Sequence, residues 1–240
     1  MKPAPIVEVT SDTEALALNA ARFIAARFSA ASTRFSVSLS GGATPKRVYE
    51  LLAVTNFTPA IDWQKIHLFW GDERFVPPDH RDSNFRMAQE ALLDRVPIPG
   101  TQVHPIPTSY DSPERAAISY ETSLQEFYQA KEFDPARPLF DLTLLGLGED
   151  GHTASLFPNT KALEERNAWV TSTIGAKPEP RISLTYPALE SSREILFIVS
   201  GAKKQQILSR VLANDPTLPA ARLETGGIIR IFADQEAMGN

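Results

Sequence analysis

Three titratable residues fall within four positions in the segment 142–158. Glu149, Asp150 and His152 follow an apolar, β-prone run over 142–147. The run predicts a strand buried on both faces, and we expect a short helical segment after His152. An imidazole beside a carboxylate can act as a general base near neutral pH, because the carboxylate orients the ring and stabilises its protonated form. In an open α/β sheet the carboxyl ends of the strands form the ligand crevice, so these side chains should face a substrate.

Two alternatives exist for the same segment. Residues 146–151 fit the dinucleotide-binding pattern G-x-G-x-x-G. We reject that interpretation, because Glu149 and Asp150 would repel a pyrophosphate and Pro158 cuts off the long helix that should follow. The second alternative is a polar turn without function, since Gly, Asp and His are ordinary turn residues. Residues 146–152 taken alone do not exclude this second alternative.

A second candidate is the loop after the predicted strand 34–40. Thr44 before Pro45 predicts a helix start, with Thr44 as the cap and proline in the first helical position. Two glycines allow close approach of a ligand, and the helix N-terminus favours an anion such as phosphate. The loop is not a P-loop, because no Gly-Lys-Ser/Thr follows, and a plain turn remains the alternative. The candidate phosphate-binding residues of this loop are Ser40, Gly41, Gly42 and Thr44.

Basic residues follow two other predicted strands. Arg74 comes after the strand 66–70 and two acidic residues. It could belong to an ordinary surface ion-pair cluster, but its place after a buried strand favours the crevice, where a guanidinium can clamp a phosphate or an oxyanion. Lys203 and Lys204 precede a predicted helix, and lysine at a helix start opposes the dipole. One of these lysines is therefore expected to meet an anion.

The remaining pattern alternates strands with helices. Further strands are predicted at 6–9, 169–174, 181–184 and 195–199, the last being the final clearly buried strand. Helices are predicted from about 12 to 28, 83 to 96, 112 to 130, and after Lys204. His67 and His104 are interpreted as structural. This order predicts an α/β fold with one open, mostly parallel sheet and helices on both faces, in a single domain over 1–240.

Composition excludes several classes of protein. The net charge is −5 and no run of Lys or Arg forms a basic stripe, so nucleic acid and anionic membranes are not expected partners. The absence of cysteine excludes disulfides and thiol catalysis. No signal-peptide core and no apolar stretch of about 18 residues occur, so we expect a soluble, cytoplasmic protein.

Metal-dependent and serine-nucleophile chemistry are not expected. No His/His or His/carboxylate set has helical ligand spacing, and Asp150 with His152 alone is too small a ligand set. Ser155 is a conceivable nucleophile, but it lies in no G-x-S-x-G elbow.

Several motifs together resemble the 6-phosphogluconolactonase family, in order and across nearly the whole chain. They are SLSGGATPKRVYELL, FWGDERFVPPDHRDSN, LLGLGEDGHTASLFP, RISLTYPAL, the turn Gly201-x-x-Lys204 and LPAARL. The resemblance implies a Rossmann-like α/β fold shared with glucosamine-6-phosphate deaminases. It also implies hydrolysis of 6-phospho-D-glucono-1,5-lactone in the pentose phosphate pathway, with no cofactor. The segment IIRIFADQEA is a looser match to the aromatic-rich end of the family, which puts little about the chemistry in doubt.

The resemblance also implies roles for residues. His152 would activate water and Asp150 would be the carboxylate beside it. The implied substrate- and phosphate-binding residues are Ser40, Gly41, Gly42, Thr44, Asp72, Arg74, Arg181 and Lys204. We further expect Arg74 to keep Asp72 and Glu73 ionised but occupied, which leaves His152 as the free base.

Two other functions stay open. One is a sugar-phosphate isomerase or deaminase on the same fold. The other is a non-catalytic sugar-phosphate sensor, which would not need the Asp–His pair and would usually carry an additional binding module. The expected partner is a small sugar-phosphate lactone, and the expected assembly is a monomer or a weak homo-oligomer.

Overall fold

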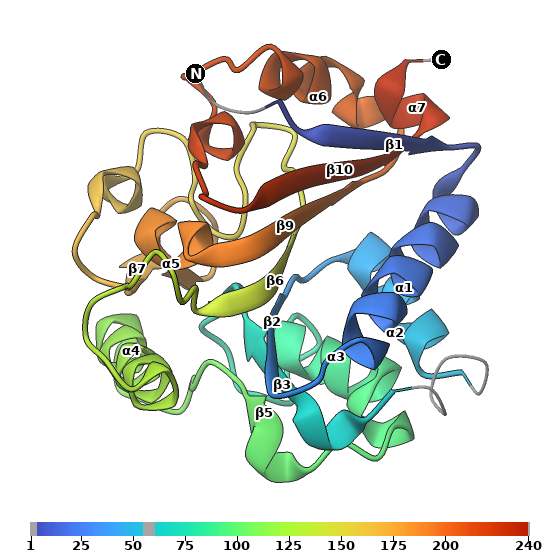
Figure 1. The fold of residues 1–240 in the computed structure, drawn as a ribbon. Helices are drawn as coiled ribbons and strands as arrows, with labels where there is room; N and C mark the ends of the chain where they lie inside the picture. The colour runs from blue at the N-terminus through green and yellow to red at the C-terminus, as the bar shows by residue number, and fades with distance from the viewer. Residues whose placement is uncertain (1–3, 55–60, 240) are drawn as a thin grey trace.

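The central layer of the protein is a seven-stranded sheet in the order β1-β10-β9-β6-β2-β3-β5, and all its neighbouring strands are parallel. The computed structural model describes residues 4–54 and 61–239, so the predicted domain over 1–240 includes some positions outside the described residues. Figure 1 shows the sheet running diagonally through the molecule. Its strands are β1 (Ile6–Thr10), β2 (Phe35–Leu39), β3 (Ile66–Trp70), β5 (Val103–His104), β6 (Phe140–Leu145), β9 (Ser192–Val199) and β10 (Ile228–Asp234).

A second, antiparallel sheet of three strands continues from the end of β3. Its order is β4 (Asp72–Arg74), β8 (Arg181–Leu184) and β7 (Val170–Thr173). Gly71 alone separates β3 from β4, and the Leu184 N–H donates to its carbonyl at 2.9 Å. The small sheet therefore begins at the carboxyl edge of the large one.

Helices cover both faces of the large sheet. Figure 1 shows α1, α2 and α3 on one side and α4 and α5 on the other. The bounds are α1 (Thr13–Ser29), α2 (Ala43–Leu52), α3 (Asn84–Ala91), α4 (Pro113–Tyr128), α5 (Tyr186–Glu190), α6 (Gln205–Leu212) and α7 (Gln235–Met238). The predicted fold class, an open parallel sheet with helices on both faces, is confirmed.

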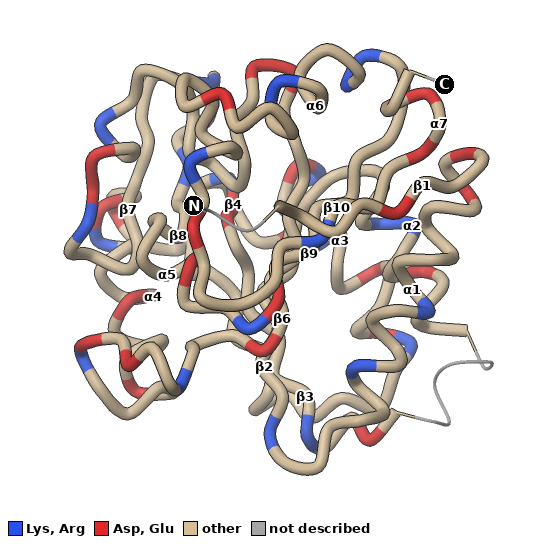
Figure 2. The backbone as a smooth tube through the Cα atoms, turned by 45° about the horizontal axis from the view of Figure 1, so that its top comes forward, with Lys and Arg blue, Asp and Glu red and all other residues tan. Residues whose placement is uncertain are grey.

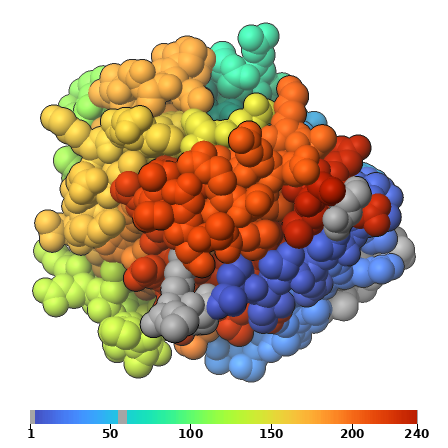
Figure 3. Space-filling model, turned by 90° about the horizontal axis from the view of Figure 1, so that it is seen from above, coloured from blue at the N-terminus to red at the C-terminus, as the bar shows by residue number. Residues whose placement is uncertain are grey.

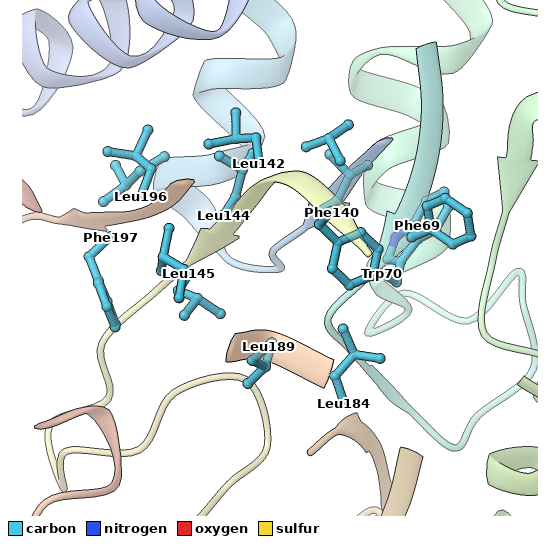
Figure 4. Close-up of a cluster of buried hydrophobic side chains, with 14 of the residues drawn as sticks. Phe69, Trp70, Phe140, Leu142, Leu144, Leu145, Leu184, Leu189, Leu196 and Phe197 are labelled. Carbon is cyan, nitrogen blue, oxygen red and sulfur yellow. The ribbon is translucent and has the colours of Figure 1, made fainter. Parts of the chain in front are cut away.

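The core is centred on β6 and β9, whose side chains are buried on both faces of the sheet. Leu144 pairs with Leu196 and Leu145 with Phe197. Figure 4 shows these residues together with aromatic side chains from β3 and β6. A strand covered by helices on both sides reads as a continuous apolar run, which is why β6 was predictable. Each such side chain contributes about 1.5–3 kcal/mol on burial.

The helix predicted after His152 is absent from the described residues. Turns occupy this segment, with one antiparallel bridge between Thr153 and Leu156. Gly151 has φ +81° and Ala154 has φ +46°, and a right-handed helix cannot pass through such conformations. The prediction was wrong because it took polar residues after a strand for a helix start.

Two other boundaries differ from the prediction. The helix predicted over 83–96 ends at Ala91, and a 3₁₀ turn over Leu93–Arg95 follows. The strand 195–199 is not the last buried strand, because β10 lies between β1 and β9 in the sheet. Its first residues are partly exposed and its last four are buried.

Charged residues are spread over the whole chain. Figure 2 shows Lys and Arg interspersed with Asp and Glu along the backbone, with no single basic stripe. Among the residues that the structure describes, no helix combines the length and the apolar character that crossing a membrane requires.

Candidate active site

The sheet reverses its order between β2 and β6. From β2 the chain continues to β3 and β5 on one side, whereas β6 is followed by β9 and β10 on the other. Ligands of open α/β sheets bind outside the carboxyl ends of the strands at such a switch point. The loops that leave β2 and β6 here are 40–42 and 146–152, the two loops that the sequence singled out.

A cavity of about 250 Å³ lies at this point. The loops after β2, β6 and β9 and the strand β4 all contribute to its wall. Its lining comprises Ser40, Gly41, Gly42, Asp72, Arg74, Asn84, Gly146, Leu147, Gly148, His152, Ala154 and Lys204. Most of the predicted site residues are thus brought together. Three predicted residues do not line the cavity: Thr44, Asp150 and Arg181. Of these, Asp150 contacts His152, and Arg181 lies opposite Arg74 where β8 pairs with β4.

His152 and Asp150 form a direct pair at the cavity wall. The imidazole Nδ1 contacts Asp150 Oδ1, which also accepts the His152 backbone N–H at 3.1 Å. Since the carboxylate faces Nδ1, we assign the ring hydrogen to Nδ1 and the free lone pair to Nε2. The ring of Phe157 lies 4.6 Å from the imidazole and supports its other side.

The carboxyl group of Asp150 stays ionised. Burial raises its pKa, but the hydrogen bonds and charge of His152, with Lys177, outweigh that effect and hold the pKa below its usual value. Lys177 Nζ lies 3.9 Å from Asp150 Oδ2. An ionised carboxylate at Nδ1 orients the imidazole and stabilises the imidazolium form.

Gly148 makes room for this pair. A Cβ atom at position 148 would lie 2.0 Å from His152 Nδ1 and 2.7 Å from Asp150 Oδ1. The Gly148 N–H donates to the His152 carbonyl at 2.8 Å, which closes the loop on itself. The glycine is therefore required by the geometry of the His–Asp pair.

The loop after β2 presents the N-terminus of α2 to the cavity. Tyr49, which is fully buried, fixes Ser40 by donating to its carbonyl at 2.8 Å and accepting its N–H at 3.0 Å. Gly42, with φ +108°, is the N-cap, and no described side chain caps this helix. The prediction that Thr44 is the cap was wrong, because α2 already begins at Ala43. An uncapped N-terminus keeps its first amides available for an anion.

Glu73 is a structural residue. It is 1% exposed and accepts the backbone N–H groups of Asn84 and Phe85, which caps α3. Burial raises its pKa, and the backbone hydrogen bonds oppose that rise. Arg74 donates to the Asp82 carbonyl and, within the described chain, forms no ion pair with Asp72 or Glu73. The expectation that Arg74 occupies those carboxylates was therefore wrong.

Asp72 is held by a serine and an asparagine. Ser155 Oγ donates to Asp72 Oδ2 at 2.6 Å, and Asn84 Nδ2 donates to the Asp72 carbonyl at 2.9 Å. Ser155 is 1% exposed, and its hydroxyl is engaged with this carboxylate, so it is not presented as a nucleophile.

Three cations surround the cavity. Arg181 lies opposite Arg74 in the register of β4 and β8, and its buried Nη1 has no partner among the described residues. Burial and the charge of Arg74 lower the pKa of Arg181. Lys204 lines the cavity, whereas Lys203 is exposed and does not. Arg74 and Lys204 line the cavity, so a dianion placed here would meet two cations directly, with Arg181 next to Arg74.

Known proteins with similar sequences and folds identify the family of this chain. Residues 11–230 match the family model described as glucosamine-6-phosphate isomerases/6-phosphogluconolactonase. The chain belongs to this family. It is 41% identical to a 6-phosphogluconolactonase of Nostoc sp. over 96% of both chains. It is 46% identical to one of Synechocystis sp. over 85% of this chain and 84% of the relative.

Solved structures of the family have the same fold. A 6-phosphogluconolactonase from Trypanosoma cruzi superposes with a TM-score of 0.87 at 29% identity, over all of this chain and 98% of the other. A structure described as a monomeric glucosamine-6-phosphate deaminase gives a TM-score of 0.81 at 21% identity, over 98% of this chain and 99% of the other, which shows a shared fold.

Asn84 lines the cavity but was not among the residues predicted from the sequence. Its side chain lies against Gly41, where a Cβ would be 2.1 Å from Asn84 Oδ1, and it lines the cavity. The only sequence signal is its place in the motif HRDSN. Among residues 4–54 and 61–239, no group of three or more His, Asp or Glu side chains is arranged to hold a metal ion.

Proposed function

We propose that this chain hydrolyses 6-phospho-D-glucono-1,5-lactone to 6-phosphogluconate, a step of the oxidative pentose phosphate pathway. The relatives named for this activity align along most of the chain. The observation that carries the proposal is the His152–Asp150 pair beside a cavity that also holds Arg74, Lys204 and a helix N-terminus. A hydrolase for a phosphorylated lactone needs this combination, a base for water and cations for the phosphate.

General-base catalysis by His152 is the mechanism that the pair supports. A δ-lactone is an activated ester, so a positioned base with charge stabilisation suffices without a covalent intermediate. His152 Nε2 takes a proton from water while the water oxygen attacks the lactone carbonyl. The ring C–O bond then breaks, and the imidazolium returns the proton to the leaving ring oxygen. Asp150 keeps the imidazole oriented throughout.

The phosphate group is assigned to the cationic side of the cavity. The proposed contacts in the cavity lining are Ser40, Gly41, Gly42, Arg74 and Lys204, with Asp72 as a substrate-binding carboxylate. Thr44 and Arg181, which do not line the cavity, are the two further proposed contacts. The tetrahedral oxyanion is held by an arginine or by backbone N–H groups.

One observation favours the isomerase or deaminase alternative. Asp72 lines the cavity and has no ion pair with Arg74 among the described residues, so a carboxylate lies near the proposed substrate site, with its Oδ2 accepting the Ser155 hydroxyl. An isomerase needs a base over the carbon next to a carbonyl, whereas lactone hydrolysis needs a base that reaches water.

Two assays separate these functions. We expect acid release from 6-phosphogluconolactone above the spontaneous rate, unaffected by a chelator. We expect no deuterium incorporation into glucosamine-6-phosphate or ribose-5-phosphate in heavy water. Rapid enzyme-dependent exchange at the carbon next to the carbonyl would overturn the hydrolase assignment.

We also propose that residues 1–240 act as a single domain. The pairing of β1 with β10 in one continuous sheet supports this, since it joins the two ends of the chain.

A further inference from the structure

Asp234, at the end of β10, is a buried carboxylate that the proposed mechanism does not use. It is 1% exposed. Its Oδ1 accepts the N–H groups of Ala237 at 2.8 Å and Gly201 at 3.0 Å. Its Oδ2 accepts the hydroxyls of Ser200 at 2.5 Å and Thr13 at 3.1 Å. Four donors from three separate parts of the chain thus converge on one side chain.

Two of these donors belong to the loop that leads to the cavity. Ser200 and Gly201 follow β9 directly, and the Lys204 N–H donates to the Gly201 carbonyl at 2.9 Å. Gly201 has φ +93° and begins a single 3₁₀ turn over Ala202–Lys204. The carboxylate of Asp234 therefore fixes the start of the turn whose last residue lines the cavity. Figure 3 shows this part of the chain, in orange, at the surface beside the yellow segment that follows β6.

Lys204 depends on its backbone for its position. Among residues 4–54 and 61–239, its ammonium group has no acidic partner within ion-pair distance. The backbone sets where the flexible four-carbon stem of this lysine begins, and therefore which positions its ammonium group can reach. Burial raises the pKa of Asp234, but hydrogen bonds from Ser200, Gly201, Ala237 and Thr13 outweigh it and hold the pKa below its usual value.

We propose that Asp234 is a positioning residue for Lys204. Its carboxylate holds the 200–204 loop so that the lysine ammonium reaches the anionic group of the substrate. The inference rests on the proposed function, because it assumes that Lys204 binds the phosphate. It assigns a specific role to the C-terminal segment that contributes no residue to the cavity.

The test is a double-mutant cycle with Asp234→Asn and Lys204→Ala. An asparagine has one acceptor oxygen and a donating NH₂ group, so it cannot accept from all four donors. We expect Lys204→Ala to raise KM for the lactone about tenfold, as for one lost charge-assisted hydrogen bond. Asp234→Asn should raise KM several-fold and leave kcat within about twofold. In the Lys204→Ala background it should leave KM unchanged, because the group that it positions is gone.

A control variant removes a different carboxylate, which lies after α6 and away from Lys204. Asp215 lies beyond the far end of α6 and pairs with Arg210. Asp215→Asn should leave KM unchanged in both backgrounds. If Asp234→Asn does not fold, Ser200→Ala replaces it, since it removes only one of the four donors and should raise KM to a smaller extent.

The outcomes are distinguishable. An active wild type whose KM rises in Lys204→Ala but not in Asp234→Asn would overturn the positioning role. Equal effects of Asp234→Asn in both backgrounds would also overturn it, because they would show a role independent of Lys204. A wild type without lactonase activity, or a Lys204→Ala variant with unchanged KM, would instead contradict the proposed function and its site.

Discussion

His152 and the His67–His104 pair lie in two different regions of the molecule, and only His152 is arranged for chemistry. At the switch point, His152 faces a cavity and its Nδ1 contacts a carboxylate. At the far edge of the sheet, His67 Nδ1 lies 3.1 Å from His104 Nε2, and His104 stacks on Phe69 with ring centroids 4.4 Å apart. Neither of these two rings lines the cavity.

The two regions differ in the partner of each histidine and in how deeply the imidazole is buried. Burial, together with His67, lowers the pKa of His104 to about 4, so this pair stays neutral and acts as packing. His152 has an ionised partner that stabilises the charge it gains when it accepts a proton. The comparison shows that the surroundings of a histidine, and not its presence, make it a base.

The largest expected difference between the two regions is in catalysis. His152→Asn should reduce kcat/KM for the lactone by about 10²–10⁴-fold with little change in unfolding, because a general base typically contributes that factor. His104→Phe, which keeps the stack on Phe69, should leave kcat/KM unchanged. The measurement is acid release from fresh lactone, corrected for spontaneous hydrolysis. Near-wild-type turnover of His152→Asn would remove this residue from the mechanism.

A smaller effect is expected from displacing the base without removing it. Gly148→Ala would place a Cβ 2.0 Å from His152 Nδ1 and force the His–Asp pair apart. A misplacement of about 1 Å can reduce the rate by about 10²-fold. Gly100→Ala is the matched control, because a Cβ there meets no atom within 4 Å. Steady-state kinetics and thermal unfolding of both variants test this, and an unchanged rate in Gly148→Ala would show that the pair is not needed in this geometry.

The next largest difference between the two regions is expected in the stabilisation of the protein by ligands. 6-Phosphogluconate should stabilise the protein much more than gluconate, by about 2.7 kcal/mol at 100 times Kd or about 5–10 °C in Tm. Arg74→Ala and Lys204→Ala should weaken this protection, whereas His104→Phe should not. Thermal unfolding with each ligand gives the comparison. Equal protection by both ligands would show that the anion site is wrongly assigned.

The smallest expected effect is the pH dependence of stability at the His67–His104 pair. His104 takes up a proton near its ordinary value of 6.5 in the unfolded chain but only near 4 in the folded one. Between these values the unfolded state binds more protons, so the free energy of unfolding falls as pH falls from about 6.5 to 4. With allowance for solvent screening, we expect a loss of about 1–2 kcal/mol. Urea unfolding between pH 7 and 5 measures this loss. The free energy of unfolding of His104→Phe should depend less on pH than that of the wild type. Equal pH dependence in the two proteins would show that other groups cause the loss.

The sequence predicted the parts of the fold whose signals are local. The strand β2 alternates apolar residues with serine and β6 is largely apolar, and glycines follow both, so the two strands and the loops after them could be predicted. The bounds of β6 were less accurate, because the predicted strand 142–147 lies two residues after the observed Phe140–Leu145. The site residues on those loops followed from the rule that crevices form at carboxyl ends of strands. Seven of the predicted site residues line the cavity, and four of them lie on these two loops. The other three are Asp72, which the family resemblance implied, Arg74 and Lys204.

The missed features depend on tertiary contacts. Arg230 interrupts the apolar pattern of β10, and its pairing with Glu194 at 3.1 Å is visible only in the folded chain. Thr44 has the residue type of a cap, but α2 begins one residue earlier. Asn84 and Asp234 act through side-chain contacts with residues far away in the sequence, which no local pattern reports.

The pairing of β10 between β1 and β9 has a kinetic consequence. Ile6 pairs with Arg230, so strands near the two ends of the 240-residue sequence are neighbours in the sheet. During synthesis β1 leaves the ribosome long before β10 exists, and its hydrogen-bonding edge has no native partner for most of that time. Contacts of such long sequence separation form slowly, because the chain between them must be ordered or closed into a loop first. The contact between Asp234 and Gly201, which accompanies the β9–β10 pair, spans only 33 residues, so we expect β1 to join an edge that is already formed.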